Sequence, residues 1–174
     1  MDLNLLKTFK ISLVIYTGLN TVFTLIAMFT VPGFHINIMV ITNMIFAPIF
    51  TFPGAAWSTN GILPLLTSTD FFTDFMLFLN LIVPPLVTVI VASFLGDSNK
   101  TVFRAWILTA LITCIGYALL LGIAPLFSFN IANVWAAKVA SYGELGTILV
   151  VIIAGIANGL FYGGVAYIIT KEGL

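Results

Sequence analysis

The chain has 174 residues, of which 61% are hydrophobic and 7% are charged, whereas soluble domains usually carry about 25% charged residues. Because this composition cannot supply a water-exposed surface, we expect an all-α integral membrane protein, a helical bundle that forms a single transmembrane domain over residues 1–174. The formal net charge is zero and the six basic residues form no run, so nucleic acid is a poor candidate partner.

Four segments are apolar over the roughly 20 residues that a helix needs to cross a lipid bilayer. They are residues 11–31, 72–95, 104–126 and 145–170. The first segment follows Lys7 and Lys10, as in a signal peptide, but it is longer than the apolar core of about 7–15 residues that signal peptides have. We therefore predict that it stays in the mature protein as the first transmembrane helix.

A fifth apolar stretch, residues 36–52, is shorter and runs into a segment with repeated helix breakers. The breakers are Pro48, Pro53, Gly54, Gly61 and Pro64. Residues 34–69 are predicted either to enter the membrane and return as a re-entrant hairpin, which gives four spans, or to cross it twice as short broken helices, which gives six.

The distribution of basic residues favours these two topologies over five crossings, because short loops rich in Lys and Arg stay in the cytoplasm. With an even number of crossings before residue 96, five basic residues share one side and Lys138 alone lies opposite. The five are Lys7, Lys10, Lys100, Arg104 and Lys171. We therefore predict a multi-pass protein of the cell membrane with both termini in the cytoplasm.

The loop at residues 127–143 has its larger apolar side chains at near-helical spacing, which is typical of an amphipathic helix on the membrane surface. Three tryptophans, Trp57, Trp106 and Trp135, fall near predicted span ends. Indole rings favour the membrane–water interface, so we predict that these three side chains lie there.

The predicted spans have no acidic residue near their middle and no recognisable catalytic motif. Every acidic residue lies in a tail, in a loop or at a helix edge, and neither His35 nor Cys114 has a second metal-ligating or catalytic residue at motif spacing. No GxSxG, HExxH or SxxK motif occurs. We therefore expect no enzymatic activity, no catalytic residue, no metal site and no cofactor.

Asparagines are the polar residues inside the predicted spans. Asn20, Asn43, Asn80 and Asn158 each fall near the middle of a different apolar segment, where an amide without a hydrogen-bond partner is costly. They must face protein, one another or water. One interpretation is that they join helices by hydrogen bonds. The other is that they form a mid-membrane site for an uncharged or zwitterionic solute.

The prolines at positions 84 and 85 favour a site near Asn80. Proline has no amide hydrogen, so the backbone carbonyls of Asn80 and Leu81 lose their helical donors, and we predict a helix kink at Pro84 and Pro85. Free carbonyls in broken helices form ligand sites in many transporters. The candidate ligand-binding residues are Asn20, Asn43, Asn80, Leu81 and Asn158.

Three glycines in the last span, Gly155, Gly159 and Gly163, recur every four residues. A stripe of this kind lets a second helix approach backbone to backbone in lipid. The sequence does not decide whether that second helix belongs to this chain or to another protein.

These features lead to one main functional hypothesis and two alternatives. The main hypothesis is a non-catalytic subunit of a larger membrane complex, which packs against other membrane subunits, or against copies of itself, through small-residue helix faces. The first alternative is a small-solute transport component whose asparagines bind the solute at mid-membrane. The second is a self-contained channel, which would have to oligomerise to enclose a pore.

Overall fold

The computed structural model describes residues 3–30, 62–123 and 132–170, and none of these is in a β-strand. The elements are α1 (Leu3–Thr30), α4 (Ile62–Thr67), α5 (Phe71–Leu95), α6 (Asn99–Ile123) and α7 (Ala132–Ile169). Four of them, α1, α5, α6 and α7, contain stretches long and apolar enough to cross a membrane, which confirms the four predicted helical segments. Most of the predicted broken segment at residues 34–69, with His35, Asn43 and Trp57, lies outside the described residues.

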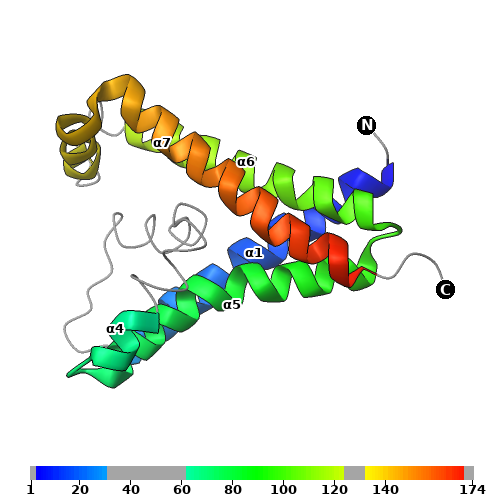
Figure 1. Ribbon diagram of the computed structural model, residues 1–174, viewed down its shortest axis with the longest axis horizontal. Coiled ribbons are helices and arrows are strands. Elements are labelled where there is room, and N and C mark those ends of the chain that lie inside the picture. Colours follow the sequence, from blue (N-terminus) through cyan, green and yellow to red (C-terminus); the bar gives the residue numbers. More distant parts are fainter. Residues whose placement is uncertain (1–2, 31–61, 124–131, 171–174) are drawn as a thin grey trace.

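The four long helices alternate in direction. The starts of α1 and α6 and the ends of α5 and α7 lie at one end of the molecule, which we call the basic end for the side chains described below (Figure 1). Helix α6 packs most extensively against α7, and α1 contacts both α5 and α6. The α1–α5 pair and the α6–α7 pair lie together at the basic end and diverge toward the other end (Figure 1).

Local side-chain chemistry sets the ends of α5 and α6. Asp70 caps α5, because its carboxylate accepts hydrogen bonds from the amide (3.3 Å) and the hydroxyl (2.8 Å) of Thr73. Ser98 caps α6 in the same way, with its Oγ 3.3 Å from the amide of Thr101. The turn between the helices is tight because Gly96 lies directly against the side chain of Val102. The two helices are therefore connected by only three residues, 96–98.

Helix α7 contains a sharp kink at Gly143, whose φ of 72° and ψ of 167° are not helical. A positive φ is strained for any residue with a side chain, so glycine suits this position. The kink separates the helical residues 132–142 from the apolar span that follows them. It lies close to the boundary that the sequence predicts between the loop at 127–143 and the span at 145–170. Residues 132–142 are helical as predicted, whereas their location on a membrane surface stays a prediction.

The centre of the bundle is an aromatic cluster around Trp106. Its indole ring makes edge-to-face contacts with Tyr16 of α1 (ring centroids 5.8 Å apart) and with Tyr162 of α7 (6.0 Å). All three side chains are at most 1% exposed. The prediction that Trp106 anchors the molecule at a membrane interface is therefore wrong. Helix α6 begins at Asn99, five residues before the predicted start, and this places Trp106 two turns inside the helix.

The glycine stripe of α7 packs against α6 of the same chain. A Cβ atom built on Gly155 would lie 2.6 Å from the Sγ of Cys114. A Cβ on Gly159 would lie 3.4 Å from the Cα of Ile107, and one on Gly163 would lie 3.1 Å from the ring of Phe103. The question that the sequence left open is thus answered: α6 is the helix that the stripe approaches.

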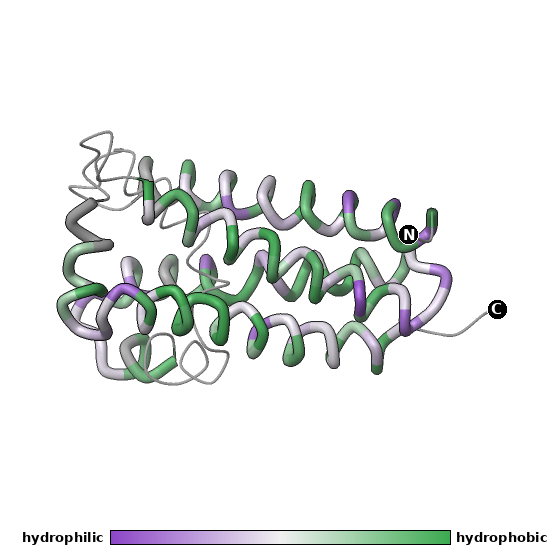
Figure 2. The backbone as a smooth tube through the Cα atoms, turned by 90° about the horizontal axis from the view of Figure 1, so that it is seen from above, coloured by the Kyte–Doolittle hydropathy of each residue, from purple (hydrophilic) through white to green (hydrophobic). Residues whose placement is uncertain are grey.

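Charged side chains separate between the two ends of the bundle. The basic end has the exposed residues Lys7 and Lys10 in the first turns of α1 and Lys100 and Arg104 in the first turns of α6. Among the described acidic residues, Asp97 lies at the same end, whereas Asp70 and Asp74 lie at the start of α5, at the opposite end, and Glu144 directly follows the kink of α7. Apolar residues extend along the helices between these ends (Figure 2).

We predict that Gly155→Leu lowers the free energy of unfolding by about 1–3 kcal/mol, because the new side chain would overlap Cys114 and push α6 away from α7. The matched control is Gly116→Leu, since a Cβ at Gly116 has no atom within 4 Å and the residue is exposed. Thermal unfolding in detergent measures the difference. Equal stability of the two variants would contradict the close α6–α7 contact.

Candidate functional site

Three of the four predicted asparagines are described, and all three are buried. The exposed fraction is 0% for Asn20 on α1, 6% for Asn80 on α5 and 0% for Asn158 on α7. The expectation that these amides face protein is confirmed for these three residues. Their participation in ligand binding stays a prediction, and Asn43 lies outside the described residues.

Asn20 and Asn158 lie one helical turn from the aromatic cluster, on the same side of it. Asn20 follows Tyr16 by four residues on α1, and Asn158 precedes Tyr162 by four residues on α7. Because α1 leads away from the basic end and α7 leads toward it, both steps go in the same direction (Figure 1). The indole Nε1 of Trp106 donates a hydrogen bond of 3.4 Å to the backbone carbonyl of Asn158, which fixes α7 at this level.

A second polar contact shows which residues of α5 and α7 lie at the same height in the bundle. The Oγ of Ser93 lies 3.4 Å from the backbone carbonyl of Ala166, and the two helices run in the same direction. Counting back eight residues on each helix places Pro85 level with Asn158. The prolines and two of the asparagines thus belong to the same region of the bundle.

Asn80 lies five residues before Pro85, about 7 Å farther from the basic end at the helical rise of 1.5 Å per residue. The structure therefore does not place the three asparagines in one layer. The backbone carbonyls of Asn80 and Leu81 lie at the same height in the bundle as the Asn80 side chain. Pro84 and Pro85 leave both carbonyls without an amide donor. Helix α5 continues through both prolines from Phe71 to Leu95.

The side-chain oxygen of Asn80 differs from the buried hydroxyls of the bundle in its hydrogen bonding. Its Oδ1 is inaccessible to solvent and accepts no hydrogen bond from any residue that the structure describes. The buried hydroxyls instead donate to the backbone carbonyl four residues earlier in their own helices, as Thr88 does to Pro84 (2.7 Å) and Thr24 to Asn20 (2.8 Å). These hydroxyls are already satisfied locally, whereas Asn80 retains acceptor capacity inside the bundle.

The described part of this arrangement offers amide and backbone carbonyl groups as hydrogen-bonding partners. In the described part of the chain, no group of three or more His, Cys, Asp or Glu side chains is arranged to hold a metal ion. Cys114 is buried against Gly155 and serves the packing of α6 on α7. What this polar region can do chemically is to exchange hydrogen bonds with an uncharged or zwitterionic molecule.

Elsewhere, the described surface includes a larger and a smaller groove that are not lined by asparagines. The larger, of about 490 Å³, lies between α6 and α7 at the basic end, and the smaller, of about 240 Å³, lies along α1 beside Lys10. Sequence reasoning missed the larger groove. It used Lys100 and Arg104 for orientation alone, although their i, i+4 spacing at the edge of a span places both on one face of a helix.

We predict that Trp106→Ala destabilises the fold by about 3–5 kcal/mol, since it leaves a large cavity between Tyr16 and Tyr162 and removes the hydrogen bond to Asn158. The matched control is Phe94→Ala, because Phe94 is 84% exposed. Chemical denaturation in detergent micelles, followed by circular dichroism, gives both values. A small effect for Trp106→Ala would show that the aromatic cluster is not the centre of the bundle.

The chain was compared with known proteins at three levels. No protein-family model, no curated protein and no solved structure matches it. Three features of the chain bear on its function. They are buried asparagines on three helices, two prolines close to one of these asparagines, and basic side chains at one end of the bundle.

Proposed function

We propose that the protein is a non-catalytic transport component of a membrane, which binds a small uncharged or zwitterionic solute inside the helix bundle. The observation that carries this proposal is the buried Oδ1 of Asn80, which accepts no hydrogen bond from the described residues and lies beside two backbone carbonyls that the prolines leave without amide donors. A buried acceptor without a donor is unfavourable by about 1–3 kcal/mol, so its retention calls for a compensating partner. A bound solute with a hydroxyl, amide or ammonium donor would be such a partner.

Two further features support solute binding over a purely structural role for the amides. Asn20 and Asn158 lie in the neighbouring layer on two other helices, so three helices contribute polar groups to one region. The α1–α5 and α6–α7 pairs diverge away from the basic end (Figure 1). Relative movement of two helix pairs around a central site is a common basis for alternating access.

The packing of the glycine stripe weakens the hypothesis of a subunit in a larger membrane complex. Gly155, Gly159 and Gly163 were the sequence argument for a partner subunit, and α6 of the same chain occupies that face. The stripe therefore no longer argues for a second protein.

A subunit of a larger membrane complex remains the second candidate, favoured by a different surface. Gly18 on α1 is exposed, a Cβ built on it would meet no atom within 4 Å, and it lies between the exposed side chains of Val14 and Val22. A glycine on an outward helix face allows close approach of a helix from another protein or from a second copy. This surface is separate from the buried asparagines.

We further propose that the protein resides in the cell membrane with both termini in the cytoplasm. The four basic side chains at the basic end support this orientation, because Lys and Arg near span ends favour the cytoplasmic side. The acidic residues Asp70, Asp74 and Glu144, near the other end, would then face the outside.

We predict that Asn80→Leu abolishes retention of a small molecule by the purified protein while leaving its thermal stability within about 1 kcal/mol of wild type. The matched control is Thr88→Val, which removes another buried polar group of α5, one that is already bonded to Pro84. Gentle solubilisation followed by mass spectrometry identifies the retained small molecules, and thermal unfolding measures stability.

The same preparation separates the two candidates. A small molecule retained by wild type and by Thr88→Val, but absent from Asn80→Leu, supports the transport proposal. A stoichiometric protein partner that is lost in Gly18→Leu supports the subunit candidate. If Asn80→Leu lowers stability and changes nothing that is retained, the asparagine joins helices and the transport proposal is wrong.

We predict that single cysteines introduced as Lys7→Cys and Lys100→Cys are labelled from the same side of the membrane and that Glu144→Cys is labelled from the opposite side. The two lysines lie at the basic end, whereas Glu144 directly follows the kink at Gly143, near the start of the α7 span at the other end of the bundle. A membrane-impermeant maleimide applied to intact cells and to inverted vesicles checks this, in a Cys114→Ala background. Labelling of positions 7 and 100 from opposite sides would exclude the proposed topology.

A further inference from the structure

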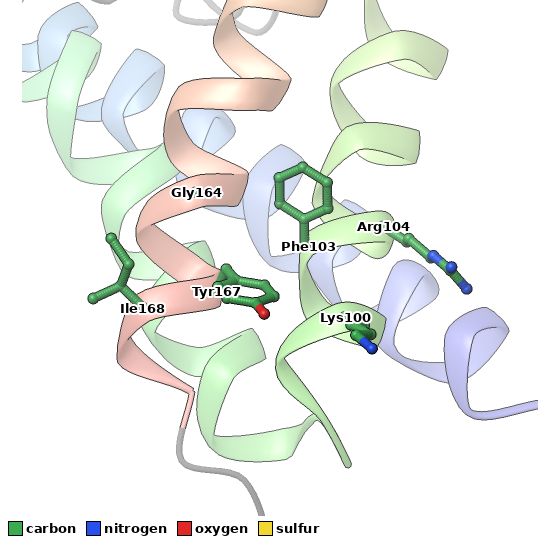
Figure 3. Close-up of a pocket in the computed structure, with 6 residues that line it drawn as sticks. All are labelled: Lys100, Phe103, Arg104, Gly164, Tyr167 and Ile168. Atoms are coloured by element: carbon green, nitrogen blue, oxygen red, sulfur yellow. The ribbon is translucent and has the colours of Figure 1, made fainter.

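The groove of about 490 Å³ at the basic end combines charged and apolar walls. It is lined by Lys100, Phe103, Arg104, Gly164, Tyr167 and Ile168. Its volume lies in the range of about 300–1,000 Å³ that small-molecule sites occupy. The first two turns of α6 form one wall and the last turns of α7 the other (Figure 3).

Two positively charged side chains of α6 line one side of this groove. Lys100 and Arg104 are four residues apart, so they project from the same face of the helix, and both side chains are exposed. Within the part of the chain that the structure describes, neither forms an ion pair with a carboxylate. Figure 3 shows the Arg104 guanidinium extending from α6 away from α7, so an anion that meets both cations would lie at the outer, α6 edge of the groove.

Aromatic and aliphatic side chains form the rest of the groove. Tyr167 extends from α7 toward α6 (Figure 3), and its ring meets that of Phe103 edge to face with centroids 6.3 Å apart. A Cβ built on Gly164 would meet no atom within 4 Å, so the groove is open at this position. An occupant would therefore contact apolar surface along the helices and positive charge at their ends.

The geometry points to an anionic phospholipid as the occupant: its phosphate would lie against Lys100 and Arg104, and its glycerol and first acyl segment would lie against Phe103, Gly164 and Tyr167. This assignment rests on the membrane location proposed above. A charged head joined to an apolar chain matches the groove, because the cations lie at the end of two apolar spans and the apolar wall leads toward their middle. Basic pockets between helices at the cytoplasmic side bind lipid head groups in this way.

The experiment uses the full-length protein in a neutral detergent, with phosphatidylglycerol and phosphatidylcholine added separately at equal concentration, and native mass spectrometry to count bound lipids. We expect one phosphatidylglycerol per chain to persist at a collision energy that removes phosphatidylcholine. The double variant Lys100→Gln with Arg104→Gln should bind phosphatidylglycerol about tenfold more weakly or worse, because both phosphate contacts are lost.

The matched control is the double variant Lys7→Gln with Lys10→Gln, which removes the same charge from the basic end outside this groove. It should retain phosphatidylglycerol as wild type does. Gly164→Leu, which keeps both cations and fills the open part of the groove, should also weaken binding, and circular dichroism verifies that each variant is folded.

Three results would overturn the assignment. Equal weakening by the two double variants would mean that lipid responds to the overall charge of this end. Equal retention of phosphatidylcholine and phosphatidylglycerol would mean that the cations do not select the lipid. Displacement of the lipid by inorganic phosphate at millimolar concentration, with unchanged binding in Gly164→Leu, would mean that the site takes a free anion. These three results do not depend on the solute-binding proposal, because Asn80 is not part of the groove.

Discussion

Backbone-close packing between α6 and α7 is the constraint on which the arrangement of the other helices depends. Glycine at positions 155, 159 and 163 removes the side chains that would separate the two helices, and α6 supplies Cys114, Ala110, Ile107 and Phe103 to the resulting surface. In an apolar environment the hydrophobic effect gives helices little reason to associate, so dispersion contacts over a long, close interface must contribute the stability. With α6 and α7 fixed in this way, Trp106 is positioned to contact α1 through Tyr16 and α7 through Tyr162.

The polar interior follows from this packing. Trp106 donates to the carbonyl of Asn158, and Ser93 reaches the carbonyl of Ala166, so two side chains set the level of α7 against its neighbours. Most buried hydroxyls satisfy themselves within their own helices, which leaves the asparagines as the groups able to interact between helices or with a ligand. Asn80 is the informative residue, because it is buried, its side-chain oxygen accepts no hydrogen bond from the described part of the chain, and two prolines follow it. This coincidence, and the internal use of the glycine stripe, are why we rank a solute-binding component above a complex subunit.

The two ends of the bundle differ in the charge of their side chains. The basic residues of α1 and α6 lie at one end, and three acidic residues lie near the other, so the two ends would meet different environments across a bilayer. At the basic end the same lysine and arginine that indicate orientation also line a groove with aromatic walls. In the topology and lipid site that we propose, this single pair of side chains would have two physical roles: it would disfavour translocation of the α5–α6 turn, and it would present a charge-complementary surface to an anionic head group.

The four long apolar helices, their approximate limits and the lack of charge near their centres could be predicted from the sequence, because the length and composition of a membrane-crossing helix are local properties of the chain. The sequence also located the boundary at Gly143 within a few residues, since the end of an apolar run is visible without a structure. Tertiary structure alone decided that Trp106 is a core residue, that the glycine stripe faces α6, and that Asn80 lies about 7 Å from the level of Asn158. These depend on which helix faces meet and in what register, and the hydrophobic pattern of a helix that is apolar on every side contains almost no information about its facing or its register.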